Sequence, residues 1–560
     1  MNTTGKPGLA ATGPVYKSEM TTCGCRRDRP SARAEVAYGN AVVLPCRWMR
    51  RSACVISVGA GLLIAALVTG CASLPPLQDR PATYALQPST DGTLGRAVLP
   101  QVQQHPGLTG VIPIADGRVA FGVRASLARS ATRSIDIQTF IWHPDSTGTL
   151  LFEEVMRAAE RGVRVRLLLD DLNTAGIDPT LALLASHPNL ELRLYNPFVG
   201  RASRTLGYMG DFTRLNHRMH NKSFTIDNVV SVVGGRNIAD EYFEIGAAGL
   251  VDLDVVAVGD AVRQVSAEFD LFWNSASAYP AGMIIAGVVP EPRDTLAQRE
   301  RAIRNDPVSA KYADAIANSE DVKGMLAGTV RAEWTTAHLV HDDPAKTLST
   351  EDKPELLLLP RLEEAFGQPV KSLDLISPYF VPGDAGTEAL SALVKRGVRV
   401  RVLTNSLAST DVKSVQAGYV KHRDALLRAG VQVFELKPDA GSIERRAGEI
   451  GRGSKAGLHA KTYTVDGRAI FVGSFNLDPR SSKLNTEMGL VIDSAQMAER
   501  LSSAVDKAYP ELAYRVSIGP DGNVMWEDGS GKVYDTDPGS GWFERAIVRI
   551  GSWLPIDWLL

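Results

Sequence analysis

The residues most able to do chemistry in this chain stand in one short phrase that is written twice. Each copy has the spacing H-x-K-x-x-x-x-D and is followed by a turn of small residues and an asparagine. The copies lie 239 residues apart and comprise His220, Lys222, Asp227 and Asn237, then His459, Lys461, Asp466 and Asn476. Two imidazoles can serve as nucleophile and as acid/base, while lysine and asparagine side chains hold phosphate oxygens. The doubled set therefore predicts a two-histidine site for phosphoryl transfer.

The elements that must position these residues are β-hairpins. Residues Lys222–Val233 and Lys461–Val472 alternate around a turn at Asp227-Asn228 or Asp466-Gly467, which is typical of a hairpin. His and Lys at positions i and i+2 of a strand project from the same face, so one strand presents both groups to one cavity. Asp227 and Asp466 lie at the turns, and we expect them to be structural.

Further repeats surround the hairpins. Ser134-Ile135-Asp136 recurs as Ser372-Leu373-Asp374, and the sequence R-G-V-R-V-R begins at both Arg161 and Arg396. Helix-period stretches at Leu150–Arg161 and Thr387–Arg396 separate these strands, and alternating strands and helices predict α/β layering. The glycine after each helix suits a C-terminal cap. In the Arg-Val-Arg strands we expect the arginines on a half-solvated edge.

Composition excludes few classes of protein. The chain has 560 residues, 44% hydrophobic residues and a formal net charge of −2. A chain of this length can bury a large core over several domains. Its near-neutral net charge gives no overall basic field of the kind that indicates nucleic-acid binding. The His-x-Lys spacing is not a zinc pattern, and the catalytic body lacks H-E-x-x-H and paired cysteines, so we expect neither a metal nor a cofactor.

The N-terminal region has the pattern of a bacterial lipoprotein signal. Met49-Arg50-Arg51 precedes an apolar run, Ala53 to Val68, which ends in small residues and Cys71. This pattern predicts lipidation of Cys71, and the alternative is an uncleaved transmembrane anchor. We expect residues 1–48 to be an over-extended or disordered start. All five cysteines lie at or before Cys71, so no disulfide is expected in the catalytic body.

With its two phrases in register, the chain resembles the phospholipase D superfamily. Several longer stretches are most similar to bacterial cardiolipin synthases, among them Arg214–Lys222, Gly234–Ile238, Gly473–Arg480 and the ending Trp553–Leu560. The resemblance implies two pseudo-twofold-related α/β/α sandwich domains with one active site between them. It also implies that the reaction needs no metal.

Roles for the site residues follow from the same resemblance. His220 is expected to attack phosphorus and His459 to act as acid/base, although the symmetry of the sequence does not fix this order. Each histidine needs a carboxylate to orient its second nitrogen. The resemblance places that carboxylate on the strand after each Asn turn, at Asp252 and Glu487, with Asp254 as a rival for Asp252. His217 is a candidate to line the cavity.

The expected function is phosphatidyl transfer through a phosphohistidine, forming cardiolipin from phosphatidylglycerol and a donor, either phosphatidylethanolamine or phosphatidylglycerol. The main alternative is phospholipase D hydrolysis to phosphatidic acid. An exported nuclease is a third reading, disfavoured by the near-neutral charge. A catalytically idle envelope-binding lipoprotein is a fourth, disfavoured by the two intact His/Lys sets. The expected partners are phospholipids and the membrane, not nucleic acid.

We divide the chain into seven segments, listed here in order: the N-terminal start (1–48), the signal or anchor (49–70), a linker (71–125), the first phospholipase D-like domain (126–289), a connecting segment (290–353), the second domain (354–520) and an apolar, aromatic tail (521–560). The tail either docks on the body or lies at a lipid interface. We expect a membrane-anchored protein that faces the periplasm, with the choice between inner and outer membrane left open.

Overall fold

The computed structural model describes residues 73–554 except for short gaps at 79, 202, 246–248, 330, 350, 352, 439 and 441–455. The predicted start, the signal segment, Cys71 and the last six residues of the tail lie outside the described residues. Within the described part of the chain, no helix has both the length and the apolar character needed to cross a bilayer.

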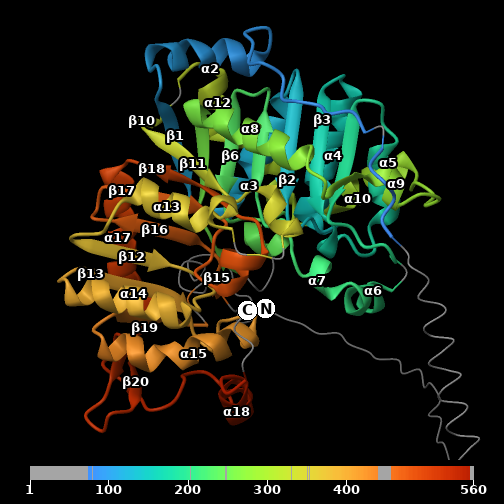
Figure 1. The fold of residues 1–560 in the computed structure, drawn as a ribbon. Helices are drawn as coiled ribbons and strands as arrows, with labels where there is room; N and C mark the ends of the chain where they lie inside the picture. Colours follow the sequence, from blue (N-terminus) through green and yellow to red (C-terminus); the bar gives the residue numbers. More distant parts are fainter. Residues whose placement is uncertain are drawn as a thin grey trace, which may run out of the picture. The chain divides into compact units, whose positions relative to one another are not determined.

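Two large mixed sheets organise the described chain (Figure 1). The first sheet, in spatial order, consists of β10 (Glu333–Thr335), β1 (Thr109–Ile114), β8 (Asp254–Gly259), β6 (Val230–Gly234), β5 (Ser223–Ile226), β2 (Ser134–Thr139), β3 (Arg164–Asp170), β4 (Leu190–Tyr195) and β9 (Ala278–Pro280). The second consists of β11 (Ala337–His341), β18 (Met488–Ile492), β17 (Ala469–Gly473), β16 (Lys461–Val465), β12 (Ser372–Ile376), β13 (Arg399–Asn405), β14 (Gln432–Leu436), β19 (Ala513–Ile518), β20 (Val524–Glu527) and β21 (Val533–Tyr534).

The two sheets share one topology. Strands β1-β8-β6-β5-β2-β3-β4 of the first sheet correspond in order to β11-β18-β17-β16-β12-β13-β14 of the second. In both, the middle strands β2-β3-β4 and β12-β13-β14 are parallel and the hairpin strands are antiparallel. We refer to each sheet and its covering helices as the first half and the second half.

Helices cover the sheets and the connections between them. The α-helices are α2 (Thr93–Gln104), α3 (Gly117–Ser130), α4 (Ser146–Glu160), α5 (Asp178–Ala185), α6 (Arg204–Gly210), α7 (Phe212–Leu215), α8 (Asp260–Trp273), α9 (Ala281–Ile284), α10 (Arg293–Asn305), α11 (Ala310–Asn318), α12 (Glu320–Leu326), α13 (Leu358–Phe366), α14 (Gly383–Lys395), α15 (Lys413–Arg428), α17 (Ala495–Glu511) and α18 (Trp542–Gly551). Short 3₁₀ or π turns are η1 (Asp171–Asn173), η2 (Asp240–Phe243), η3 (Pro344–Leu348), η4 (Pro354–Leu356) and η5 (Arg480–Leu484).

Each half is a three-layer sandwich because its central strands are apolar on both faces. In β3, Leu167 and Leu169 join the core under α3 and α4, whereas Leu168 packs against Phe269 of α8. In β13, Val402 packs in the core with α15, and Leu403 lies on the other side with Val505 of α17. The predicted α/β layering is therefore confirmed.

The predicted hairpins and helix caps are also present. Strands β5 and β6 pair around Asp227 and Asn228, which both have φ of 53°, and β16 and β17 pair around Asp466 with φ of 54°. Helices α4 and α14 each end before a glycine, Gly162 or Gly397, with φ of 93° and 88°.

The expectation for the Arg-Val-Arg strands is wrong at two positions. Arg166 and Arg401 are buried, at 0% and 3% exposure. Their guanidinium groups bind the carboxylates of Asp136 and Asp374, with Nε–Oδ1 distances of 2.7 Å in both pairs. The parallel register places each aspartate directly beside its arginine on the neighbouring strand, so a charged residue there faces a partner and not water.

The connecting segment joins the two sheets. Strand β10 pairs with β1 of the first sheet, and β11, which follows it after Thr336, pairs with β18 of the second. A further core cluster contains side chains from both halves, including Val233 and Val255 of the first and Val472 and Leu490 of the second. A short parallel pair, β7 (Gly249–Val251) with β15 (Ala456–Leu458), also crosses between the halves.

Candidate active site

The doubled phrases converge on one buried centre between the halves. His220 and His459 are 8% and 6% exposed, and Lys222 and Lys461 are 3% and 1% exposed. Their charges interact across the boundary, because the ammonium groups of both lysines contribute to lowering the pKa of each histidine. The structure thus brings together the four residues that the sequence analysis predicted to carry the chemistry.

Each histidine is held by a carboxylate of the opposite half. His220 Nδ1 lies 2.8 Å from Glu487 Oε2, and His459 Nδ1 lies 2.6 Å from Asp252 Oδ2. The expectation that Asp252 and Glu487 orient the histidines agrees with this geometry, but the exchange of partners between halves was not foreseen. With Nδ1–H directed at a carboxylate, Nε2 of each imidazole is left with its lone pair.

Backbone pairing fixes this exchange. His220 N donates to Thr486 O at 2.9 Å, and Thr486 N donates to Arg218 O at 2.9 Å, so the chain before Glu487 runs beside the chain before His220. In the other direction, His459 N donates to Val251 O at 2.8 Å, which places Asp252 beside His459. These main-chain hydrogen bonds therefore place each carboxylate beside the histidine of the opposite half.

Asp254, the rival for Asp252, is not at the centre. Its Oδ2 lies 2.8 Å from Arg124 and 3.2 Å from Arg236, within the first half. Asp252 and Asp254 come close to Gly235 and Gly234 of the Asn turn. A Cβ on Gly235 would lie 2.3 Å from Asp252 Oδ1, and one on Gly234 would lie 2.0 Å from Asp254 Oδ1. A side chain at Gly235 would meet the carboxylate of Asp252, and one at Gly234 would also meet the backbone of Leu253 and Asp254.

The two asparagines differ in their surroundings. Asn237 Oδ1 accepts a hydrogen bond from Ile141 N at 3.3 Å. Asn476 is buried, and its Oδ1 has no hydrogen-bond partner among the described residues. Both amides are positioned by the turns at the ends of β6 and β17. The Oδ1 atom can accept a hydrogen bond from a hydroxyl of a ligand, whereas Nδ2 is the atom of Asn476 that can donate to a phosphate oxygen.

The lysine side chains fold back toward their own histidines. Lys222 Nζ donates to His220 O at 2.6 Å, and Lys461 Nζ donates to His459 O. Burial lowers the pKa of Lys461 to about 8, and burial lowers the pKa of Lys222 well below its usual value. Lysines of this kind gain strongly from an anionic ligand, since a phosphate would restore the charged form.

The electrostatics of the two histidine pairs differ. Burial lowers the pKa of His220 well below its usual value and lowers that of His459 to about 4, so both imidazoles are neutral without a ligand. Burial raises the pKa of Glu487 to about 7. Burial also acts to raise the pKa of Asp252, but the attraction of His459 outweighs it and the pKa is lowered. Asp252 is thus a fixed negative charge, whereas Glu487 is close to half-protonated at neutral pH.

Sequence reasoning missed the residues that support Glu487 and the two imidazoles. Ser481 Oγ donates to Glu487 Oε1 at 2.9 Å, and Glu487 N donates to Asp342 Oδ2 at 2.8 Å. The rings of Phe140 and Tyr242 stand edge-on to His220 and His459, each with a centroid distance of 5.0 Å. Ser481 and Tyr242 each lie five residues after a motif asparagine, and that shared position was the available signal, whereas Phe140 and Asp342 lie far from both motifs.

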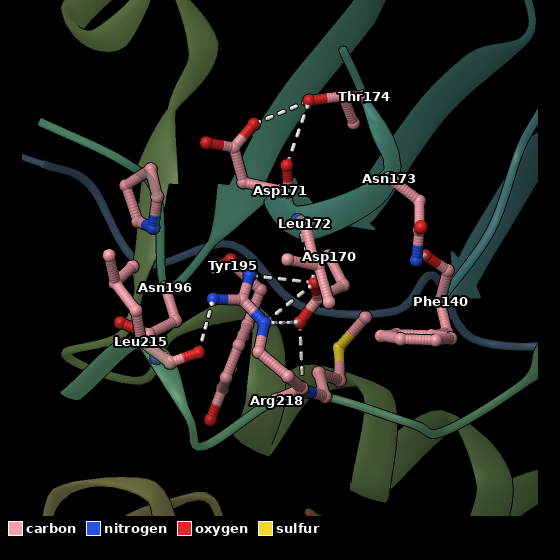
Figure 2. A network of polar contacts seen from close by, with 12 residues as sticks. Phe140, Asp170, Asp171, Leu172, Asn173, Thr174, Tyr195, Asn196, Leu215 and Arg218 are labelled. Carbon is pink, nitrogen blue, oxygen red and sulfur yellow. Dashed lines mark hydrogen bonds and ion pairs between the residues drawn. The ribbon is translucent and has the colours of Figure 1, made fainter. Parts of the chain in front are cut away.

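A buried ion pair holds the segment that leads into His220 (Figure 2). Arg218 Nη2 lies 2.6 Å from Asp170 Oδ1, and Met219 N donates to Asp170 Oδ2 at 2.9 Å. Asp170 is the last residue of β3, and its carboxylate also accepts from Leu172 N at 2.9 Å. This network fixes the two residues that precede His220, and His220 and Lys222 lie just before β5 and not within it as the sequence analysis expected.

The motif aspartates lie at the hairpin turns. Asp227 Oδ1 accepts from the backbone N–H groups of Arg133 and Ser134 at 2.8 and 2.9 Å. Asp466 Oδ1 accepts from Lys371 N and Ser372 N at 2.7 and 3.0 Å. Each carboxylate therefore ties its hairpin to the start of the adjacent strand. His217 is half-buried, and its Nδ1 contacts Thr213 O at 2.8 Å, not either catalytic histidine.

Among the described residues, no group of three or more His, Cys, Asp and Glu side chains is arranged to hold a metal ion. The arrangement can instead bind a phosphodiester between two neutral imidazoles and two lysines. The imidazole Nε2 atoms provide a nucleophile and a proton carrier, and the lysine and asparagine donors can hold the non-bridging oxygens.

Comparison with known proteins agrees with this chemistry. The sequence pattern of a family described as "Cardiolipin synthase, PLD-like domain" matches residues 125–273 and 362–508. Cardiolipin synthase C of Escherichia coli (strain K12) is 43% identical over 83% of this chain and 99% of its own length. A cardiolipin synthase of Oceanobacillus iheyensis is 24% identical over 71% of this chain and 68% of its own. Among solved structures, a phosphatidylserine synthase of Haemophilus influenzae covers 74% of this chain and 91% of its own, at 15% identity and a TM-score of 0.48.

Proposed function

Because this chain belongs to the cardiolipin synthase family of phospholipase D-like proteins, we propose that it is a phosphatidyltransferase that forms cardiolipin from phosphatidylglycerol and a donor phospholipid. The observation that carries the mechanism is the pair of neutral imidazoles, each held at Nδ1 by a carboxylate of the other half. Donors are phosphatidylethanolamine or a second phosphatidylglycerol.

In the first step His220 Nε2 attacks the phosphorus of the donor. The P–N bond forms as the bond from phosphorus to the headgroup oxygen breaks. His459, which takes up a proton when the phosphodiester anion binds beside it, gives that Nε2 proton to the leaving alcohol. Lys222, Lys461 and the two motif asparagines hold the phosphate oxygens, where negative charge develops. The product of this step is a phosphatidyl group on His220 and a free headgroup alcohol.

The second step reverses the roles with a different alcohol. A glycerol hydroxyl of phosphatidylglycerol gives its proton to His459 Nε2 and attacks phosphorus, and the P–N bond breaks. Cardiolipin leaves, His220 is regenerated as a neutral imidazole, and His459 is protonated for the next cycle. Atoms and charges balance without a metal or a redox partner.

The assignment of His220 as nucleophile is supported by the asymmetry of the carboxylates. An acid/base histidine must be stabilised as an imidazolium, and a fixed carboxylate does this best. Asp252, with its lowered pKa, is such a group beside His459. Glu487 has its pKa raised to about 7 by burial, so it stabilises an imidazolium less and leaves His220 neutral for attack.

The order of roles is tested with an activated phosphodiester whose nitrophenol leaving group needs no acid. His459→Asn is expected to accumulate a phosphorylated enzyme on His220, stable to alkali and labile to acid, because the second step lacks its base. His220→Asn is expected to accumulate none. Peptide mass spectrometry identifies the site, and a phosphorylated His459 in the His220→Asn variant would reverse the assignment.

The reaction itself is tested by product analysis. The wild-type protein is incubated with labelled phosphatidylethanolamine and unlabelled phosphatidylglycerol, and labelled cardiolipin is expected. Release of labelled phosphatidic acid alone would mean that water is the acceptor and would refute the transferase. His220→Ala and His459→Ala are expected to form neither product.

We further propose that the protein works at a membrane surface, and the support comes from α18. Val548 of this helix is 4% exposed and packs with Leu407 and Ala417. The side of the helix opposite Val548 is apolar and exposed at Trp542 (75%), Phe543 (61%), Ile547 (46%) and Ile550 (57%). Trp553 (75%) and Leu554 (49%), which follow the helix, are exposed as well. The helix therefore docks on the body through Val548, and its exposed apolar side supports the lipid-interface alternative for the tail.

Such a face suits a phospholipid interface, where tryptophan rings lie at headgroup depth and cations meet anionic lipid. Arg549, also exposed, flanks the apolar side. In protein lacking residues 1–72, Trp542→Ser with Trp553→Ser is expected to lower binding to phosphatidylglycerol-containing vesicles by about tenfold or more. Val289→Ser, at a site 79% exposed, is the control. Equal flotation of both variants would contradict the proposal.

For localisation, we propose a periplasm-facing protein anchored through lipidated Cys71 or through an uncleaved helix. The motif at Val68–Cys71 supports the first form. Labelling cells with a fatty-acid probe distinguishes them: Cys71→Ser is expected to lose the label and to shift the protein from the membrane fraction. Membrane retention without any label in the wild type would favour the uncleaved helix.

A further inference from the structure

One aromatic ring contacts both chemical groups of the first H-x-K motif. The ring of Phe140 lies 5.0 Å from the imidazole of His220, centroid to centroid, with an angle of 69° between the two planes. The ammonium nitrogen of Lys222 lies over the same ring, 5.5 Å from its centroid. The histidine assigned as nucleophile and the cation beside it therefore share one neighbour.

The position of this ring follows from the pairing of β2 with β5. The two strands are antiparallel, and their pairing ends at Gln138 with Ser223. Phe140 follows the end of β2, and the stretch from His220 to Lys222 precedes the start of β5. The residue that leaves one strand therefore meets the motif that enters the other, at the same end of the sheet.

Two asparagine side chains hold the backbone at Phe140. Asn173 Nδ2 donates to Phe140 O at 3.4 Å, and Ile141 N donates to Oδ1 of the motif residue Asn237 at 3.3 Å. The amide of Asn173 points at that carbonyl in Figure 2. The carbonyl and the N–H of one peptide group are thus both held by side chains, so the ring projects from a fixed piece of backbone.

The second half has a similar backbone arrangement without the ring. Phe140 and Pro378 each stand six residues after one of the matched serines, Ser134 and Ser372. The carbonyl of Pro378 also accepts from an asparagine amide, Asn405 Nδ2, at 3.5 Å. The fold therefore does not require an aromatic residue at this position, and the ring belongs only to the half that carries the assigned nucleophile.

A π face stabilises a cation most strongly where water is excluded. Lys222 is 3% exposed, and burial lowers the pKa of its ammonium group well below the usual value. Its Nζ donates to the carbonyl oxygen of His220 at 2.6 Å, and the negative face of the Phe140 ring adds a second attraction. The charged form of Lys222 is the form that holds phosphate oxygens.

We propose that Phe140 is a positioning residue for phosphoryl transfer: its π face keeps Lys222 charged and in place, and its contact with His220 fixes the plane of the attacking imidazole. The ring acts through these two groups and not on the substrate. This role rests on the function proposed above, since it requires a phosphate to bind at Lys222. An aliphatic side chain would fill the same space without supplying the π face.

The test changes the electron distribution of the ring and keeps its shape. In the full-length protein in detergent, Phe140 is replaced by mono-, di- and trifluorinated phenylalanine, which weaken the negative face step by step. The ratio kcat/KM for the nitrophenyl phosphodiester is expected to fall along the series, by at least about tenfold for the trifluorinated ring. The same series at Phe366, which is buried in the core of the second half, is expected to change the ratio by less than about twofold.

The pH dependence separates this role from a merely structural one. Without the π face the pKa of Lys222 falls further, because the charged form loses an attraction that the neutral amine does not need. The alkaline fall in kcat/KM is therefore expected to begin at a lower pH in Phe140→Leu than in the wild type. The same shift is expected when Lys461→Arg is also present, since Lys222 is unchanged there. Phe366→Leu is the matched control and is expected to leave the profile in place.

Equal rates along the fluorinated series would overturn the proposal, and so would an unshifted pH profile in Phe140→Leu. A loss of rate that only follows a falling melting temperature would overturn it too, because the ring would then act through stability. A wild type that turns over the nitrophenyl phosphodiester without forming cardiolipin would refute the proposed function, and the fluorinated series would still measure the role of Phe140. A wild type inactive toward both substrates would refute both.

Discussion

A buried acid outside the catalytic groups, Glu268 of α8, lies against the first H-x-K motif. Its carboxyl is 1% exposed and receives hydrogen bonds from Asn221 Nδ2 at 2.6 Å and Gln138 Nε2 at 2.5 Å. Burial raises its pKa to about 8. Asn221 is the middle residue of the first H-x-K motif, and its Oδ1 accepts from Thr486 Oγ1 at 2.8 Å. A neutral acid therefore supports the junction between His220 and Glu487.

The raised pKa of Glu268 makes stability depend on pH. The folded state keeps the proton of Glu268 up to about pH 8, whereas the unfolded chain releases it near pH 4.5. The contribution of Glu268 to the free energy of unfolding is therefore complete below pH 4.5 and is lost as the pH rises to 8. Glu268→Gln mimics the protonated acid. The variant and the wild type are expected to have the same melting temperature at pH 5. At pH 8.5 the variant is expected to melt at a higher temperature than the wild type. A constant difference across this range would contradict the prediction.

At the same scale, Lys461 sets an alkaline limit on catalysis. Its pKa is lowered to about 8 by burial, so its charge is present below that pH and lost above it. The ratio kcat/KM, which reports on the free enzyme, is expected to fall above pH 8. Lys461→Arg is expected to be slower and to lose the part of this fall that belongs to Lys461, since guanidinium stays charged. Lys507→Arg is the control. If the whole fall in kcat/KM near pH 8 persists in Lys461→Arg, a group other than Lys461 causes it.

At the scale of elements, the end of β3 and the segment before β5 act as one unit. Asp170 and Arg218 are fully buried and pair at 2.6 Å, and removal of one partner leaves an uncompensated charge. Asp170→Asn is expected to lower the free energy of unfolding by about 3–5 kcal/mol and to reduce kcat more than it raises KM, since His220 is displaced.

The matched control for Asp170→Asn is Asp211→Asn. Asp211 also pairs with an arginine, Arg214, but both side chains are partly exposed, at 42% and 22%. Exposed pairs contribute less than about 1 kcal/mol. Equal destabilisation by the two substitutions would mean that the Asp170 network is not a special support of the site.

A second prediction at the scale of elements concerns the turn that leads from β6 to Asn237. A side chain at Gly235 has no room, since its Cβ would lie 2.3 Å from Asp252 Oδ1. Gly235→Ala is therefore expected to push Asp252 away from His459 and to lower kcat toward the level of Asp252→Asn. Gly282→Ala, at an open position in α9, is expected to have little effect. Steady-state kinetics of the three variants check this.

These elements also show how much of the structure could be predicted from the sequence. The hairpins and capped helices could be predicted because local spacing and turn residues determine them. The burial of Arg166 could not be predicted. Alternation along a strand shows which residues share a face, but it does not show that Asp136 of the neighbouring strand pairs with Arg166. The exchange of Asp252 and Glu487 between histidines depends on pairing between segments more than 200 residues apart in the chain, and no local pattern records that pairing.

At the scale of the whole molecule, the two halves share part of one hydrophobic core. Val233 and Val255 lie in a cluster with Val472 and Leu490, so the unfolding of one half exposes apolar side chains of the other. Thermal unfolding of residues 73–554 is expected to be a single transition with equal calorimetric and van't Hoff enthalpies. Leu490→Ala is expected to shift that transition as a whole, by about 2–5 kcal/mol. Two transitions, only one of them shifted, would contradict this.

The crossed carboxylates have a consequence for how such a chain came to be. A half on its own would lack the carboxylate that the other half supplies to its histidine, so it could act only against a second, identical copy. In that symmetric pair both histidines would face the same acid. Once two copies became one gene, each could mutate alone, and one methylene group now separates Asp252 from Glu487. Two equal histidines could thereby become a nucleophile and an acid, a division of labour that identical subunits could not inherit.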